Sequence, residues 1–297
     1  MKITEDEVFS VLQDLTIDSG VGIDSVSALG ALDYAGLPGW YAAGLPEAEQ
    51  SEPYIHHFPD GNSTIARKLV CRLIPDLVSG NSLENLITAK LDYELLDDPR
   101  NDVSVRLNST VINVQNNKSA GGTVTVSYVR DNQLEKVSAS KCILACNSNV
   151  IPFICPELPD KQKEALAFQV KVPILYTNVA VKSWEAWKNL GIGAMVCPGS
   201  YHIVSMLDFP VTYGDYEFSR NEREPIVIHM ERFPHSYGSN LSAREQYKLG
   251  RYELLTTPFE TIERNVREQL ESSLSEGGFN AAKDILGITV NRWSHGY

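Results

Sequence analysis

Residues 103–146 read VSVRLNSTVINVQNNKSAGGTVTVSYVRDNQLEKVSASKCILAC, and their hydrophobic pattern is the most informative in the chain. Three runs alternate or are continuously apolar, as strands are. Asn117–Gly122 and Asp131–Asn132 separate the runs, and both are rich in residues that favour turns. Cys142–Cys146 has no charged side chain, which is typical of a strand covered on both faces of a parallel sheet. The stretch predicts an antiparallel meander that leaves a sheet and returns to it as a buried strand.

A helix is predicted upstream of this stretch. Ile65, Leu69 and Leu73 recur at four-residue spacing and form one apolar face, as in an amphipathic helix. Asn62 or Ser63 is placed to cap the first turn, and a proline follows the last turn. The stretch before this helix, EPYIHHFPDG, combines histidines, a proline and a glycine, and therefore predicts a tight loop.

The remainder of the chain combines strand and helix patterns. Apolar runs predict four strands, at Val172–Val181, His202–Leu207, Ile226–Glu231 and Ile288–Trp293. Helices are predicted over residues 4–15 and 23–34, and after two capping boxes, Ser242 with Glu245 and Thr257-Pro258 with Glu260. The second box opens a helix with an apolar face of Phe259, Ile262, Val266, Leu270 and Leu274, which ends at Gly277-Gly278.

Composition excludes several classes of protein. The chain has 297 residues, of which 43% are apolar and 22% charged, enough for one large domain or two ordinary ones. The formal net charge of −12 argues against non-specific binding of nucleic acid, which needs a basic surface. No apolar run is long enough to predict a membrane span, and the start, MKITEDEVF, does not resemble a secretory signal. A cytoplasmic location is therefore the default expectation.

The cysteines predict neither a disulfide framework nor a zinc site. They number five, and no two form a CxxC pair. Cys71, Cys142 and Cys146 lie in apolar stretches and are therefore expected to be buried free thiols, and the others are Cys155 and Cys197.

Two further motifs are weak. Gly20-Val21-Gly22 follows no apolar strand, and Ser25 occupies the third glycine position of a dinucleotide fingerprint, so a pyrophosphate loop is not predicted. Adjacent histidines on a strand point to opposite faces, so His56-His57 does not predict a shared metal ion. A packed or hydrogen-bonded histidine is the favoured interpretation, and a ring beside a bound cofactor is the alternative. No metal site is predicted.

Several stretches taken together resemble one family. They are GVGIDSVSAL, EPYIHHFPDGNSTIARKLV, VRLNSTVINV, KCILACNSNVIPFICPELP, VKVPILYTNVAVKSW and GITVNRWSHGY. They are spread over nearly the whole chain, and as a set they are specific although no single one is. The chain resembles the FAD-dependent amine oxidoreductases, and most closely their bacterial spermidine dehydrogenase-like branch.

The resemblance implies the architecture of a central segment. Full-length relatives begin with a strand, a GxGxxG loop and a helix, and after the RWxHGY stretch they continue into a second FAD-binding segment. This sequence contains neither. The expected fold is α/β (α+β), with a partial Rossmann-type FAD-binding domain carrying the β-meander and a mixed-sheet and helical substrate-binding domain. The expected boundaries are 1–52 for a helical part of the substrate domain, 53–150 for the FAD part and 151–297 for the substrate domain.

The resemblance also implies site residues. Those expected to contact FAD are Pro59, Gly61, Asn62, Val111, Ala145, Cys146 and Asn147. Those expected in the catalytic cavity are Lys171, His57, Trp293 and Tyr297. Lys171 lies where relatives place a lysine that holds a water near the flavin N5. Val172-Pro173 follows it here and departs from the family pattern.

The implied activity is oxidation of the C–N bond of an amine or polyamine such as spermidine, with FAD as the cofactor. The alternative is a truncated, non-catalytic paralogue that binds a ligand or partner without flavin. In the first case a further chain is expected to supply the missing flavin-domain parts. Asp208 and Glu231 lie on predicted strands and are candidates to bind the distal charges of a polyamine, although an exposed or structurally paired acid is the simpler interpretation. Relatives are often exported in folded form, but this sequence carries no export signal.

Overall fold

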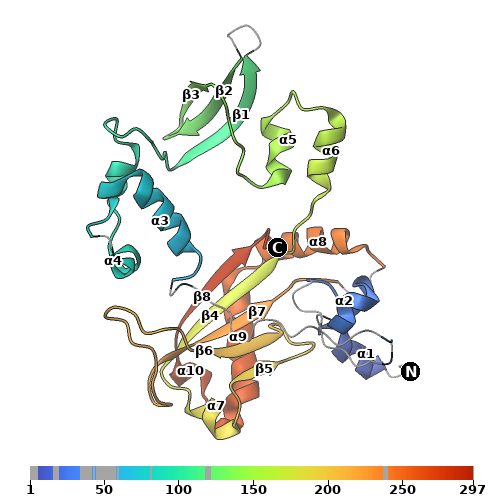
Figure 1. The fold of residues 1–297 in the computed structure, drawn as a ribbon. Helices are drawn as coiled ribbons and strands as arrows, with labels where there is room; N and C mark the ends of the chain where they lie inside the picture. Colours follow the sequence, from blue (N-terminus) through green and yellow to red (C-terminus); the bar gives the residue numbers. More distant parts are fainter. Residues whose placement is uncertain are drawn as a thin grey trace. The chain divides into compact units, whose positions relative to one another are not determined.

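The computed structural model describes residues 6–15, 20–33, 42, 44, 58, 60–80, 82–117, 122–236 and 240–296 (Figure 1). The chain forms two compact units, Met1–Ile55 with Lys171–Tyr297, and His56–Val170. Each unit combines helices with an antiparallel sheet, so the predicted mixed α/β class is confirmed. None of the helices described combines the length and apolar character that crossing a membrane requires.

The unit His56–Val170 contains a three-stranded sheet and short helices. Its elements are α3 (Ser63–Leu73), η3 (Pro75–Leu77), α4 (Leu83–Thr88), η4 (Tyr93–Asp97), β1 (Ser109–Asn117), β2 (Thr123–Arg130), β3 (Gln133–Ala139), η5 (Ser148–Val150), α5 (Ile151–Ile154) and α6 (Asp160–Phe168). The strands pair in the order β1-β2-β3, all antiparallel, which confirms the predicted meander. Asp131 and Asn132 both have positive φ, as the tight turn between β2 and β3 requires.

The predicted buried strand at Cys142–Cys146 is wrong. The segment is irregular, Ile143 is 90% exposed, and both cysteines are exposed. An apolar strand is buried only when neighbouring strands pair with both its edges and helices cover both its faces. The described residues of this unit supply no strand for it to pair with. The composition was therefore identified correctly, but the neighbours that would bury it are not among the described elements.

The predicted apolar face of α3 is exposed in this unit. Ile65, Leu69 and Leu73 are 47%, 59% and 53% exposed. The core beneath the helix is formed instead by Ile74, Leu77 and Leu96, with Val70, Cys71, Leu91, Leu95 and Val105 packed against them. No side chain caps the first turn of α3, because Ser63 Oγ donates to the Asp60 carbonyl instead. The helix does end before Pro75, as predicted.

The other unit contains a five-stranded sheet and its covering helices. Its elements are α1 (Asp6–Gln13), η2 (Ile23–Ser25), α2 (Ala28–Asp33), β4 (Ile174–Val181), α7 (Glu185–Leu190), β5 (Ala194–Val196), β6 (Val204–Asp208), β7 (Ile226–Arg232), α8 (Ala243–Thr256), α9 (Phe259–Leu274), η6 (Ser275–Gly277), α10 (Ala281–Asp284) and β8 (Ile285–Trp293). All neighbouring pairs are antiparallel in the order β5-β6-β7-β4-β8. The four predicted strands of this region correspond to β4, β6, β7 and β8.

The main core lies between one face of this sheet and α9 (Figure 1). The helix contributes Ile262, Val266, Leu270 and Leu274, all at most 1% exposed, as its apolar spacing predicts. Phe259 belongs to the predicted face but is 39% exposed, because it begins the helix. The sheet contributes Leu175, Val179, Val181, Ile226, Ile228 and Met230.

Helix starts in this unit follow the predictions in part. Ser242 and Glu245 form the predicted capping box at the start of α8. The second predicted box does not form, because Thr257 Oγ1 donates to the Glu253 carbonyl and the residue before α9 is Pro258. The predicted helix over 23–34 is interrupted at Val26, which has extended backbone.

The cysteines differ from expectation. Cys142 and Cys146 are exposed and Cys71 is half-buried, whereas Cys155 is buried. All five are free thiols. The apolar neighbours of Cys142 and Cys146 favoured burial, but burial depends on the missing strand partners described above.

Candidate functional site

The five-stranded sheet is buried on one face and partly open on the other. Along β4, residues alternate between buried and half-buried side chains after Leu175. Directly opposite residues of antiparallel strands point to the same face, so the register defines the open face. Its half-buried or exposed members are Tyr176, Asn178, Ala180, Met206, Asp208, Val227, His229, Glu231, Thr289, Asn291 and Trp293. A surface of aromatic, carboxylate and amide side chains on a rigid sheet is suited to bind a polar ligand.

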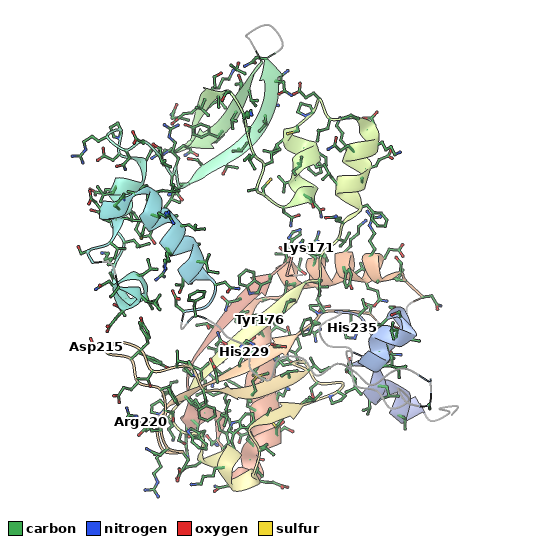
Figure 2. The ribbon with its side chains drawn as sticks, in the orientation of Figure 1. Lys171, Tyr176, Asp215, Arg220, His229 and His235 are labelled. Atoms are coloured by element: carbon green, nitrogen blue, oxygen red, sulfur yellow. The ribbon has the colours of Figure 1, made fainter. Side chains whose placement is uncertain are left out.

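His229 is at the centre of this face (Figure 2). Its Nδ1 is 2.9 Å from Asn178 Oδ1, and its Nε2 is 3.1 Å from Glu231 Oε1. The Tyr176 ring meets the imidazole edge to face, with centroids 5.0 Å apart. Contacts at both ring nitrogens hold the imidazole in one orientation and fix the Glu231 carboxylate beside it.

Two carboxylates mark out a line along the strands. Glu231 lies opposite Tyr176, and Asp208 lies opposite Val227, which is in turn opposite Ala180. Four residues of strand separate the two positions, or roughly 13 Å at the usual rise. Glu231 is paired with His229, whereas Asp208 is exposed and has no ion-pair partner among the described residues. Both acids therefore face the same surface, as candidates for distal amine charges must.

A cavity of about 410 Å³ adjoins the Asp208 end of this face. It is lined by Ala180 and Val227 of the sheet and by the connection between β6 and β7, which contributes Tyr216, Phe218, Glu217 and Glu224 among others. Glu217 is paired with Arg220 at 2.9 Å, so its charge is balanced. The cavity extends the open face and adds aromatic surface to it.

Two predicted catalytic residues belong to the opposite end of the sheet. Trp293 pairs with Ile174 across β4 and β8 and is 54% exposed, and Lys171 precedes the same strand. Burial, together with the Arg251 and Lys171 cations, lowers the pKa of the His295 imidazole. The backbone is fixed here by Gly296, whose N–H donates to the Val172 carbonyl at 2.8 Å. Lys171 therefore lies three residues before the position of β4 that faces Trp293.

The residues expected to contact FAD lie in the unit His56–Val170. Gly61 is exposed and has a φ of +74°, and a Cβ on it would meet no atom within 4 Å. Val111 is 37% exposed and lies beside a β-bulge at which Ile112 is the extra residue. Asn62, Ala145 and Cys146 are also exposed, and Asn147 is half-buried and accepts from the Asn149 N–H.

These positions are accessible to a large planar ligand but do not enclose one. Gly61 leaves room for close approach, and the segment around Ala145 presents apolar surface. The residues therefore fit a surface that a cofactor covers. His57, Pro59 and Tyr297 lie outside the described residues, so their expected roles stay predictions.

Sequence reasoning missed the centre of the open face. Tyr176, Asn178 and His229 were not singled out, although alternation within the two predicted strands placed each on a definite side. The missing information was the register that brings His229 opposite Asn178. Strand pairing depends on residues far apart in sequence, and no local pattern specifies it.

Comparisons with known proteins give weak matches. No protein-family profile and no curated protein matches the sequence. The chain is similar to wild-type putrescine oxidase bound to putrescine, at 15% identity and a TM-score of 0.41 over 64% of this chain and 36% of that one. It is also similar to cyclohexylamine oxidase from Brevibacterium oxydans, at 12% identity and a TM-score of 0.39 over 62% and 34%.

A third similarity is to a conjugated-linoleic-acid-producing fatty acid isomerase from P. acnes, at 9% identity and a TM-score of 0.37 over 66% of this chain and 37% of that one. The chain spans about a third of the length of these structures. Similarity at this level fixes neither fold nor function.

Proposed function

We propose that this chain is a segment of a FAD-dependent oxidoreductase that oxidises the C–N bond of an amine or polyamine, such as spermidine. The observation that carries the proposal is the pair Glu231 and Asp208 on the open face of the sheet. Their spacing of roughly 13 Å along the strands suits an extended chain with a positive charge at each end. The sequence resemblance supports the same conclusion independently.

The chain's own residues would bind and orient the amine. A carboxylate fixed by His229 gives a charge-assisted hydrogen bond to an ammonium group, and the faces of Tyr176 and Trp293 attract cations. Lys171, next to the indole end of the face, would hold a water at the reacting end. FAD, when bound, supplies the two-electron oxidation of the C–N bond.

The alternative function is favoured by a different observation. The segment Cys142–Cys146 is irregular and exposed, which is the state expected when no flavin domain surrounds it. A non-catalytic paralogue would keep the open sheet face as a binding surface for a cationic ligand. The two functions differ in whether the chain binds FAD once the other segments of the flavin domain are added.

The test is reconstitution with FAD. The purified chain alone is expected to be colourless, because its proposed FAD contacts are exposed and the sequence has no GxGxxG loop to hold the pyrophosphate. Adding a second chain that carries the GxGxxG unit and the segment following RWxHGY is expected to give the flavin absorbance band and spermidine-dependent reduction of an artificial electron acceptor.

One outcome would contradict the proposed function, and another would contradict only the expected need for a second chain. A mixture that binds no FAD and oxidises no amine, while the chain still binds spermidine, would support the paralogue. Stoichiometric FAD on this chain alone would overturn the expectation that it needs a partner chain.

A further inference from the structure

Three of the cysteines gather in one part of the unit His56–Val170. Cys142 and Cys146 lie on the irregular segment after β3, and Cys155 follows α5 directly. Cys142 and Cys155 line the same cavity of about 370 Å³, whose other walls come from β1, β2, Leu144 and the residues after Cys155. Cys146 does not line this cavity. The two thiols that share it are therefore the pair best placed to react with each other.

The two partners differ in how firmly they are held. Cys155 is 7% exposed, packs with Val114 and Ile154, and donates its N–H to the Ile151 carbonyl at 2.9 Å. Cys142 is exposed and belongs to no strand. A disulfide requires Cα atoms about 4.4–6.8 Å apart, and an irregular segment can adjust to that distance at little cost. The cavity between them leaves the room in which Cys142 moves.

The direction of the neighbouring side chains agrees with this pairing. Leu144 packs against the core that contains Cys155, whereas Ile143 points into solvent. Cys142 and Leu144 both line the cavity that Cys155 borders.

We propose that Cys142 and Cys155 form a reversible disulfide when the chain meets hydrogen peroxide. The exposed Cys142 thiolate attacks peroxide, the O–O bond breaks, and the sulfur becomes a sulfenic acid with release of hydroxide. The Cys155 thiolate then attacks the Cys142 sulfur, the S–S bond forms, and a second hydroxide leaves. Two thiols lose two electrons and two protons, and peroxide is reduced to two waters.

The electrostatics assign the two roles. Burial raises the pKa of the Cys155 thiol, and nearby Cys142, Glu157 and Cys146 raise it further when charged. A buried thiol with a raised pKa is a poor first target for peroxide and is suited to be the second, resolving partner. The proposal does not rest on the proposed function.

The test is a thiol map of the full chain before and after treatment with one equivalent of hydrogen peroxide. Trypsin releases residues 142–161 as one peptide that carries all three thiols, because no lysine or arginine lies between Lys141 and Lys161. After alkylation under denaturing conditions, the oxidised peptide is expected to carry one alkyl group, on Cys146, and to lack two hydrogens. Cleavage after Phe153 then leaves Cys155 joined to the Cys142 fragment until a thiol reductant is added.

Variants distinguish the possible pairs. Cys142→Ser and Cys155→Ser are each expected to abolish the cross-link, and Cys146→Ser, the matched control, is expected to retain it in full. Circular dichroism checks that each variant is folded, and the wild-type map alone suffices if Cys155→Ser is not. A cross-link that includes Cys146, or oxidation of Cys142 to sulfinic acid without any cross-link, would overturn the proposal.

Discussion

The His235 imidazole lies 3.3 Å from the Asp14 carboxylate and thereby joins the segment after β7 to the turn after α1. Burial opposes the charge on Asp14, but hydrogen bonds from His235 and the Gly199 N–H hold its pKa below the ordinary value. Burial likewise opposes the charge on His235, but its contacts with Asp14 and the Phe233 carbonyl raise its pKa. The pair is therefore an ion pair between about pH 3.8 and 6.5.

This pair predicts a pH dependence of stability. Because folding raises the pKa of His235, its contribution is complete below the ordinary value of 6.5 and is lost as the pH rises through the folded-state pKa. Because folding lowers the pKa of Asp14, its contribution is present above 3.8 and is lost as the pH falls through the folded-state pKa. Urea unfolding across this range is expected to give the highest free energy of unfolding between these two values.

Replacing Asp14 tests whether the Asp14–His235 pair causes this pH dependence. Asp14→Asn is expected to lower the free energy of unfolding by about 3 kcal/mol near pH 5, since it leaves a buried charge without its partner. It should also flatten the decline above pH 6.5. Asp215→Asn, an exposed acid of the same unit, is the control and should leave the profile unchanged. An unchanged slope in Asp14→Asn would show that another group titrates.

Glu231→Gln is expected to weaken spermidine binding about 10- to 100-fold, because a charge-assisted hydrogen bond to an ammonium is lost. A monoamine of similar length should lose less, since it presents only one charge. Isothermal titration with both ligands measures the difference. Glu260→Gln, at the exposed start of α9 on the other side of the sheet, serves as the control. Equal affinities for wild type and Glu231→Gln would remove the carboxylate from the binding surface.

Gly250 permits α8 to approach the chain after β7 closely. A Cβ on it would lie 2.2 Å from the Pro234 carbonyl oxygen, which is backbone and cannot move aside alone. Gly250→Ala is therefore expected to lower the free energy of unfolding by about 1–3 kcal/mol. Gly287→Ala, where a Cβ would meet nothing within 4 Å, is the matched control and should change it little. Thermal unfolding of both variants tells whether the clash is real.

The unit His56–Val170 exposes apolar side chains that predict self-association. Ile143 is 90% exposed and Leu69 is 59% exposed. Replacing both with serine is expected to lower the apparent mass in concentrated solution without lowering stability, because neither is packed in a core. Light scattering over a concentration series measures the mass, and Leu77→Ser, which disrupts a buried position, marks the effect of unfolding. A wild-type chain that is monomeric at the highest concentration contradicts this prediction.

Much of the fold could be predicted from local pattern. The capping box at Ser242, the apolar stripe of α9 and the turn at Asp131 depend on residues close together in sequence, and each formed as predicted. The physical reason is that periodicity and hydrogen-bonding side chains act within a few residues.

The failures share one cause. Burial of Cys142–Cys146 as a strand requires neighbouring strands that local composition does not specify, and the described residues do not supply them. The centre of the candidate site was missed for a related reason, since the contact between His229 and Asn178 depends on how β4 and β7 align. Pattern predicted which segments are apolar but not what covers them.

The two faces of the five-stranded sheet differ in how tightly their side chains are packed. Every substitution toward α9 must conserve volume, whereas the alternate positions of the same strands can change without disturbing that packing. Side chains on the open face can therefore be replaced one at a time, because the packing against α9 on the other face maintains the shape of the sheet.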